Sequence, residues 1–195
     1  MTQFNRIFDL PKTEYNQKRC INYALRGIMA LNLEWLNMGE LRNLENDHAF
    51  AAYLNLVGAN GVGLFYLEMR RGLDFLAQNP NVDRSRLGST GLSGGGWQTI
   101  VLSSLDERVA ASVPVAGFAA LPSSIEHPEY IGDDMEQNSP DLRAGRDYAT
   151  LTAMRAPRAI LQIDNAAVAD SRNAGLLLPQ GRIRTAREYV FGATC

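Results

Sequence analysis

Apolar residues recur along this chain with two different periods. Between residues 62 and 78 they recur every three or four positions, which predicts an amphipathic helix. Its predicted core stripe consists of Leu64, Phe65, Leu67, Leu73, Phe75 and Leu76. A shorter helix is predicted over residues 14–26, before Gly27. Asn79 should end the long helix, because a residue that precedes a proline is pushed out of the α region.

Short runs of aliphatic and β-branched residues predict strands between these helices. We expect strands over residues 28–35, 87–90, 111–118 and 156–164, and a helix directly after residue 92. Residues 38–60 are predicted as a loop leading into a short helix, and residues 105–109 as a solvated helix end. Strands that alternate with helices favour a parallel sheet with helices on both faces.

A Gly-x-Ser-x-Gly motif, made by Gly91, Ser93 and Gly95, lies between a predicted strand and a predicted helix. At such a junction, glycines let the two backbones approach and the serine is pushed into the open at a sharp turn. The amide of Gly94 and the positive end of the helix dipole would face a developing oxyanion. A phosphate-binding loop is disfavoured, because the Lys-Ser/Thr pair and the G-x-G-x-x-G spacing are both missing. We therefore predict that Ser93 is a catalytic nucleophile.

The sequence around this motif, RRGLDFLAQNPNVDRSRLGSTGLSGGGWQTIVLSSLDERVAASVPVAG, resembles the elbow region of acetyl xylan esterase-like and dienelactone hydrolase-like enzymes. A looser resemblance extends over about residues 14 to 163. The resemblance implies a three-layer α/β-hydrolase fold, with a parallel sheet and helices on both faces. It also implies two-step hydrolysis of a carboxylic ester without cofactor or metal, with Ser93 as nucleophile and Gly94 as an oxyanion-hole donor.

Other expected parts of such an enzyme differ here. The resemblance implies a triad acid after residue 164, where Asp170 is the nearest carboxylate and Asp164 lies behind it. The histidine should follow the acid, yet His48 and His127 both precede it. A serine without an imidazole base is a poor nucleophile, so we expect the chain as written to be inactive. Residues 1–12 also lack a His-Gly-type oxyanion loop, which predicts one partial domain over residues 1–195, incomplete at both ends.

The segment after residue 164 suggests a hypothesis about the reading frame. Resembling enzymes carry Asn-Ala-Glu-Asp-Asp-Cys-Cys-Phe-Arg there, and only Asn165 and Ala166 match. If residues 175–180 were encoded GGA CTG CTG CTT CCG CAA, reading one base later would give Asp-Cys-Cys-Phe-Arg. We hypothesise a frameshift between about residues 164 and 175, which would make residues 165–195 a non-native tail. Translation of the nucleotide sequence in all three frames tests this.

Composition narrows the range of partners. A net charge of -2 gives no broad positive field for nucleic acid, and no apolar run approaches the roughly 20 residues that span a bilayer. Cys20 and Cys195 suggest neither a disulfide framework nor a zinc site. An acidic cluster near residue 40 has no zinc-ligand spacing, and we expect no metal there; its members are Glu34, Glu40, Glu45, Asp47 and His48. The first residues contain no secretory signal, and location stays open.

Three functions fit these observations. The first is hydrolysis of a carboxylic ester, either deacetylation of a carbohydrate or cleavage of a related small-molecule ester. The second is a non-catalytic α/β-hydrolase-like binding protein whose triad has decayed. The third is peptidase activity of the prolyl-oligopeptidase type, which shares the serine elbow.

Overall fold

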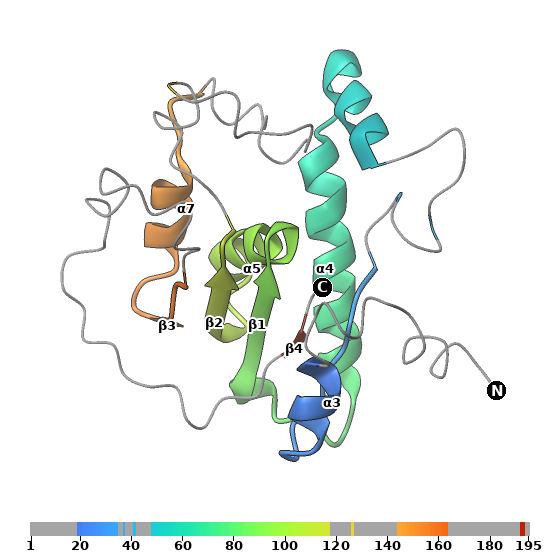
Figure 1. Ribbon diagram of the computed structural model, residues 1–195, viewed down its shortest axis with the longest axis vertical. Coiled ribbons are helices and arrows are strands. Elements are labelled where there is room, and N and C mark those ends of the chain that lie inside the picture. Colours follow the sequence, from blue (N-terminus) through green and yellow to red (C-terminus); the bar gives the residue numbers. More distant parts are fainter. Residues whose placement is uncertain are drawn as a thin grey trace.

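A computed structural model describes residues 19–34, 37, 41, 48–117, 126, 144–163 and 192–193. Their centre is a parallel sheet with the strand order β3-β2-β1-β4 (Figure 1). The strands are β1 (Leu87–Leu92), β2 (Val109–Val115), β3 (Ala159–Ile160) and β4 (Gly192–Ala193). The helices are α3 (Arg19–Ala24), η2 (His48–Val57), α4 (Gly61–Gln78), η3 (Arg84–Arg86), α5 (Gly94–Leu105) and α7 (Tyr148–Met154).

Strands β1 and β2 form the longest ladder described. Five residue pairs stay in register from Gly88 opposite Ala111 to Leu92 opposite Val115, after a shift between Leu87 and Gly88. Helix α5 connects the two strands, as a parallel connection requires. The strands predicted over residues 87–90 and 111–118 are thus confirmed in kind, with β1 extending to Leu92 and β2 running from Val109 only to Val115.

Helices cover both faces of this sheet, as predicted. Successive residues of a strand point to opposite faces, so Ser89 and Thr90 identify what lies on each side. The Ser89 hydroxyl donates to Thr99 Oγ1 of α5 at 3.4 Å. Thr90 is hydrogen-bonded to Tyr23 of α3, and burial raises the pKa of the Tyr23 phenol. Helix α3 therefore lies on the face opposite α5.

Helix α4 has the predicted bounds but a different core face. The Asn60 side chain caps its start by accepting from the Gly63 amide, and the Asn79 amide donates to Leu76 O at its end. The buried stripe is Val62, Phe65, Met69, Leu73 and Leu76. The prediction was wrong for Leu64, Leu67 and Phe75, which are 38%, 51% and 62% exposed. An α-helix has 3.6 residues per turn, so Phe65, Met69 and Leu76 share one face of α4. Leu64, Leu67 and Phe75 lie outside that face, on the outer side of the helix.

The strand predicted over residues 28–35 is a second correction. Helix α3 ends at Ala24, the Ile28 amide donates back to Tyr23 O, and residues 28–34 belong to no helix or strand. Leu33 instead packs so closely on α4 that a Cβ at Gly72 would lie 2.5 Å from Leu33 Cδ1. Leu33 of this segment is therefore placed by packing on a helix and not by strand pairing.

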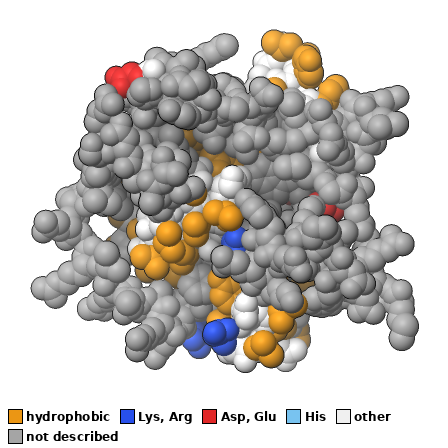
Figure 2. Space-filling model, viewed as in Figure 1, with side chains coloured by type: hydrophobic (Ala, Val, Ile, Leu, Met, Phe, Trp, Pro, Cys, Tyr) orange, Lys and Arg blue, Asp and Glu red, His pale blue; other side chains and the backbone are white. Residues whose placement is uncertain are grey.

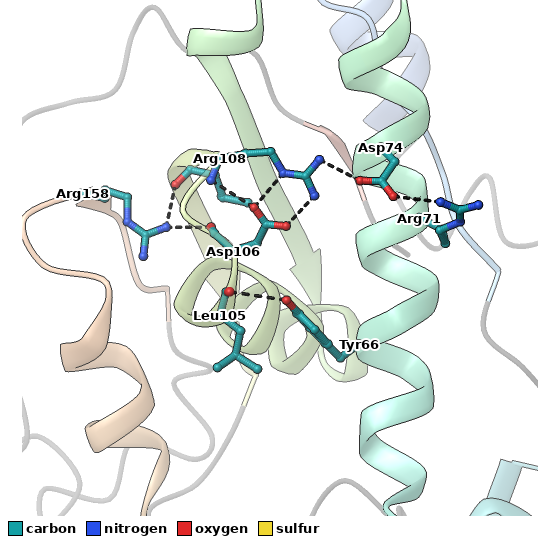
Figure 3. A network of polar contacts seen from close by, with 8 residues as sticks. Tyr66, Arg71, Asp74, Leu105, Asp106, Arg108 and Arg158 are labelled. Atoms are coloured by element: carbon teal, nitrogen blue, oxygen red, sulfur yellow. Dashed lines mark hydrogen bonds and ion pairs between the residues drawn. The ribbon is translucent and has the colours of Figure 1, made fainter.

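The connection from α5 to β2 is an ion-pair network (Figure 3). Arg108 donates to both carboxylate oxygens of Asp106, at 2.6 and 2.9 Å, and to Asp74 of α4 at 2.7 Å. Arg158 donates to the carbonyl oxygens of Asp106 and Val109. Asp106 is only 8% exposed, so the prediction of a solvated helix end was wrong here. The Arg108 guanidinium compensates the buried carboxylate and holds the pKa of Asp106 below its usual range.

We predict that Arg108→Met lowers the free energy of unfolding by about 2 kcal/mol. This is less than the cost of breaking a fully buried pair, because Arg108 is partly exposed to water. Since the Asp106 pKa is lowered in the folded state, its contribution is present at neutral pH and lost below about pH 4. Urea denaturation between pH 3 and pH 7 should therefore show a flatter pH profile for the variant.

Arg71→Met is the matched control, since Arg71 is 83% exposed and pairs with Asp74 at 3.2 Å. It should leave stability nearly unchanged. Equal losses in the two variants would contradict the central role given to Arg108.

A second arginine, Arg155, is buried, and no described carboxylate pairs with it. It is 2% exposed, and its Nη2 donates to Ala159 O at 2.5 Å. Within the described part of the chain, its Nε and Nη1 have no hydrogen-bond partner. Burial, with a smaller contribution from Arg158, lowers the pKa of Arg155 to about 10. The folded structure thus carries a desolvated positive charge at the end of α7.

We predict that Arg155→Met raises the free energy of unfolding by about 1 kcal/mol, because an apolar side chain of similar length removes this charge. Arg158→Met should act in the opposite direction, since Arg158 donates to two main-chain carbonyls. Urea unfolding at pH 7 compares the two. A loss of stability in Arg155→Met that matches Arg158→Met would contradict the prediction.

Candidate active site

Ser93 occupies a sharp turn between β1 and α5. Its φ of 56° and ψ of -120° place a non-glycine residue in a sparsely populated region of backbone space. Its side chain does not cap the helix, and the residue is exposed. The hydroxyl is therefore presented at the carboxyl end of β1.

Gly91 makes this turn possible. A Cβ at Gly91 would lie 2.3 Å from both the carbonyl carbon and the oxygen of Gly95. Real Cβ atoms do not approach a backbone so closely, so only glycine lets the end of β1 cross the first turn of α5. The motif read from the sequence therefore corresponds to a real steric requirement.

The first turn of α5 points amides toward the same end of the sheet. The first intrahelical bond runs from the Trp97 amide to Ser93 O at 3.0 Å. Gly94, Gly95 and Gly96 thus precede the point where helical hydrogen bonding begins, and their amides are among the donors that a helix start leaves without partners in the helix. Such donors, with the helix dipole, can stabilise an oxyanion beside Ser93.

Helix α5 is fixed at several points near Ser93. Thr99 Oγ1 donates to Gly95 O at 2.7 Å, within the buried face of the helix. The indole Nε1 of Trp97, which is 1% exposed, donates to the Tyr148 hydroxyl of α7 at 3.1 Å. One bond within the first turns of α5 and one to a second helix thus hold the start of α5 in place.

Sequence reasoning missed the turn that follows β2. The Ser93 amide donates to Val115 O at 2.9 Å, and Ala116 has a positive φ of 47°. Gly117 packs against α5: a Cβ there would lie 2.5 Å from the carbonyl carbon of Gly96. A glycine directly after an apolar strand was the available signal for Gly117, whereas nothing in the sequence marks Ala116.

The other predicted site residues are not brought to Ser93 by the described structure. Asp164, Asp170 and His127 lie outside the described residues, as do Glu40, Glu45 and Asp47. His48 begins η2, and Glu34 lies in the segment beside α4. In the described ranges, no three histidine, cysteine or acidic side chains gather as metal ligands would. Among those same residues, no helix combines the length and apolar character needed to cross a membrane.

An apolar surface lies on η2, toward the end of the sheet to which β1 and β2 point (Figure 1). Figure 2 shows hydrophobic side chains at the surface there. Phe50, Tyr53, Leu56 and Val57 are 43%, 62%, 81% and 79% exposed, and the Phe50 and Tyr53 rings lie 5.5 Å apart. This surface and Ser93 are thus at the same end of the sheet.

Comparison with solved structures identifies the fold. The chain is similar to a structure described as an acetyl xylan esterase from Bacteroides fragilis, with a TM-score of 0.62 and 20% identity over 73% of this chain. It also resembles the glucuronoyl esterase catalytic domain of Hypocrea jecorina (TM-score 0.46, 23% identity, 60% of this chain). The first likeness confirms the predicted α/β-hydrolase fold.

The chain spans 41% of the Bacteroides esterase and 40% of the Hypocrea domain. No family model matches the sequence. No curated protein matches it either. The likeness is therefore one of fold, between this chain and part of longer esterases.

We predict that Gly91→Ala lowers the free energy of unfolding by about 3 kcal/mol, because the added methyl group collides with the Gly95 backbone. Gly63→Ala is the matched control. Its Cβ would meet only Asn60 Cβ at 3.7 Å, and alanine is favoured in a helix, so stability should rise slightly. Chemical denaturation compares the two, and a tolerated Gly91→Ala would contradict the close approach at this turn.

Proposed function

We propose that this chain is a serine-dependent carboxylic-ester hydrolase of the acetyl esterase type, with Ser93 as its nucleophile. The observation that carries the proposal is the exposed Ser93, held at positive φ directly before the glycine-rich start of α5. A strand, a strained serine and a helix start in this order satisfy the geometry that a serine nucleophile needs. The α/β-hydrolase fold supports the same reading.

The proposed reaction has two steps. Ser93 Oγ attacks the ester carbonyl carbon while a general base accepts its proton, and the carbonyl oxygen becomes an oxyanion. The amide of Gly94 donates to that oxyanion. The tetrahedral intermediate collapses with release of the alcohol, which takes up the proton. Water then attacks the acyl group on Ser93 in the same way and releases the carboxylic acid.

Asp170 is our proposal for the triad acid, because it is the first carboxylate after the strand predicted over residues 156–164. Its role would be to orient and stabilise the protonated base. The hypothesis of a shifted reading frame after about residue 164 concerns this same segment, and a restored frame would replace Asp170 with the acid of the native continuation.

We propose a small-molecule or carbohydrate ester as substrate, and no cofactor. The similar Bacteroides structure is described as an acetyl xylan esterase, which supports an acetylated carbohydrate. A net charge of -2 gives no attraction toward nucleic acid. The exposed aromatic rings of η2 would offer an apolar surface to a sugar ring at the Ser93 end of the sheet.

A non-catalytic binding protein is the second candidate. One observation favours it: no histidine follows residue 127, so the order serine, acid, histidine is not fulfilled. Such a protein would keep the fold and the turn at Ser93 but would not form an acyl-enzyme.

Covalent labelling distinguishes the two candidates. In a longer version of the protein that supplies a histidine base, we expect a fluorophosphonate probe to modify Ser93, with formation of the Oγ–P bond and loss of fluoride, as detected by intact mass and peptide mapping. Ser93→Ala should abolish labelling. Ser85→Ala is the matched control, because Ser85 is another exposed serine, but its amide and hydroxyl donate to Asp83 Oδ1 in a surface turn, and this variant should label normally.

Absence of labelling in that longer version would support the binding protein and overturn the esterase proposal. Where labelling occurs, p-nitrophenyl acetate and a prolyl anilide separate esterase from peptidase. We expect release of p-nitrophenol, dependent on Ser93, and no cleavage of the anilide.

A further inference from the structure

The turn after β2, formed by Val115, Ala116 and Gly117, lies directly against the turn that contains Ser93. The last pair of the β1–β2 ladder is Leu92 with Val115. One residue later, the Ser93 amide donates to Val115 O at 2.9 Å. The main chain of the proposed nucleophile is therefore anchored to this neighbouring turn.

Close backbone packing fixes the same contact from a second side. A Cβ at Gly96 would lie 2.4 Å from Val115 O and 2.8 Å from Gly117 Cα. A Cβ at Gly117 would lie 2.7 Å from the Trp97 amide nitrogen. Backbone thus meets backbone here, without side chains that could adjust to a displacement.

Ala116 occupies the centre of this turn in a left-handed conformation, with φ of 47°. That region is unfavourable for a residue with a Cβ, and it persists only where the surroundings determine it. The Ala116 amide donates to Ile163 O at 2.8 Å, and the Ile163 amide donates to Pro114 O at 3.0 Å. Residue 163 is the last described residue before the segment with the candidate acid Asp170.

We propose that Ala116 is a positioning residue for the proposed hydrolase. The peptide that joins Val115 to Ala116 directs its carbonyl to the Ser93 amide and its N–H to Ile163, and the positive φ of Ala116 then turns the chain so that Gly117 packs on Gly96. One strained residue thereby sets the spacing between the nucleophile and the chain segment that leads to the proposed acid. This inference rests on the proposed function, but the geometry it describes is measurable without catalysis.

Substitutions at Ala116 test the proposal by their backbone preference. Ala116→Val should disfavour the left-handed conformation strongly, whereas Ala116→Gly accommodates it freely. We expect the valine variant to react with the fluorophosphonate about 100-fold more slowly, because a displacement of about 1 Å costs this much. The glycine variant should react within about twofold of wild type. With p-nitrophenyl acetate, the valine variant should lose kcat at unchanged KM.

Ala153→Val, on the exposed side of α7, is the matched alanine-to-valine control and should react like wild type. Normal labelling of Ala116→Val would overturn the proposal. An equal loss in the glycine and valine variants would also overturn it, because the left-handed conformation would then not be the determinant.

Amide hydrogen exchange keeps the test independent of activity and of the folding of any variant. In the wild-type chain, we expect the amides of Ser93, Ala116 and Ile163 to exchange with one common opening free energy, because their acceptors belong to one connected turn. Different opening free energies would overturn the proposal. If Ser93 does not label but the three amides share one opening free energy, the proposed function is refuted and the positioning role of Ala116 stands.

Discussion

Contact between two backbones, without intervening side chains, is the constraint on which the rest of this structure depends. The crossing of Gly91 with Gly95 and that of Gly96 with Gly117 bring β1, α5 and the turn after β2 into one unit. Side chains then secure it: Thr99 bonds to the α5 backbone and to Ser89, and Trp97 bonds to Tyr148. The exposed, strained conformation of Ser93 results from that packing.

The two ends of the sheet are built from different interactions. At the carboxyl ends of the strands, main-chain hydrogen bonds and glycine contacts hold Ser93. At the opposite end, ion pairs of Arg108 with Asp106 and Asp74 join α4, α5 and β2, and Arg158 donates to main-chain carbonyls there (Figure 3). Charge pairs tolerate small displacements better than backbone contacts do. The atoms are therefore held most tightly in place at the end of the sheet that carries Ser93, where the proposed chemistry lies.

The sequence predicts the local elements well where one short pattern determines them. The bounds of α4, the strand before Ser93, the helix after it and the exposed serine all follow from residues within a few positions of one another. Prediction failed where distant parts of the chain decide. Residues 28–34 have the composition of a strand but pack on α4, and Asp106 is buried because Arg108 and Asp74 meet it. Ala116 carries no signal, because the turn that it forms is recognisable only from its contacts with residues far along the chain, Ser93 through Val115 and Ile163 through its own amide.

The bond from the Ala116 amide to Ile163 also has a consequence for the order of events during synthesis. The residues that hold Ser93 come from three places in the chain, and the last of them is separated from Ser93 by 70 positions. Contacts between such distant residues form late in folding, since the entropy of closing the loop must be overcome first. As the chain leaves the ribosome, the serine turn can be completed only after β3 has emerged. The Ser93 hydroxyl would therefore reach its final geometry only once most of the surrounding sheet is available to support it.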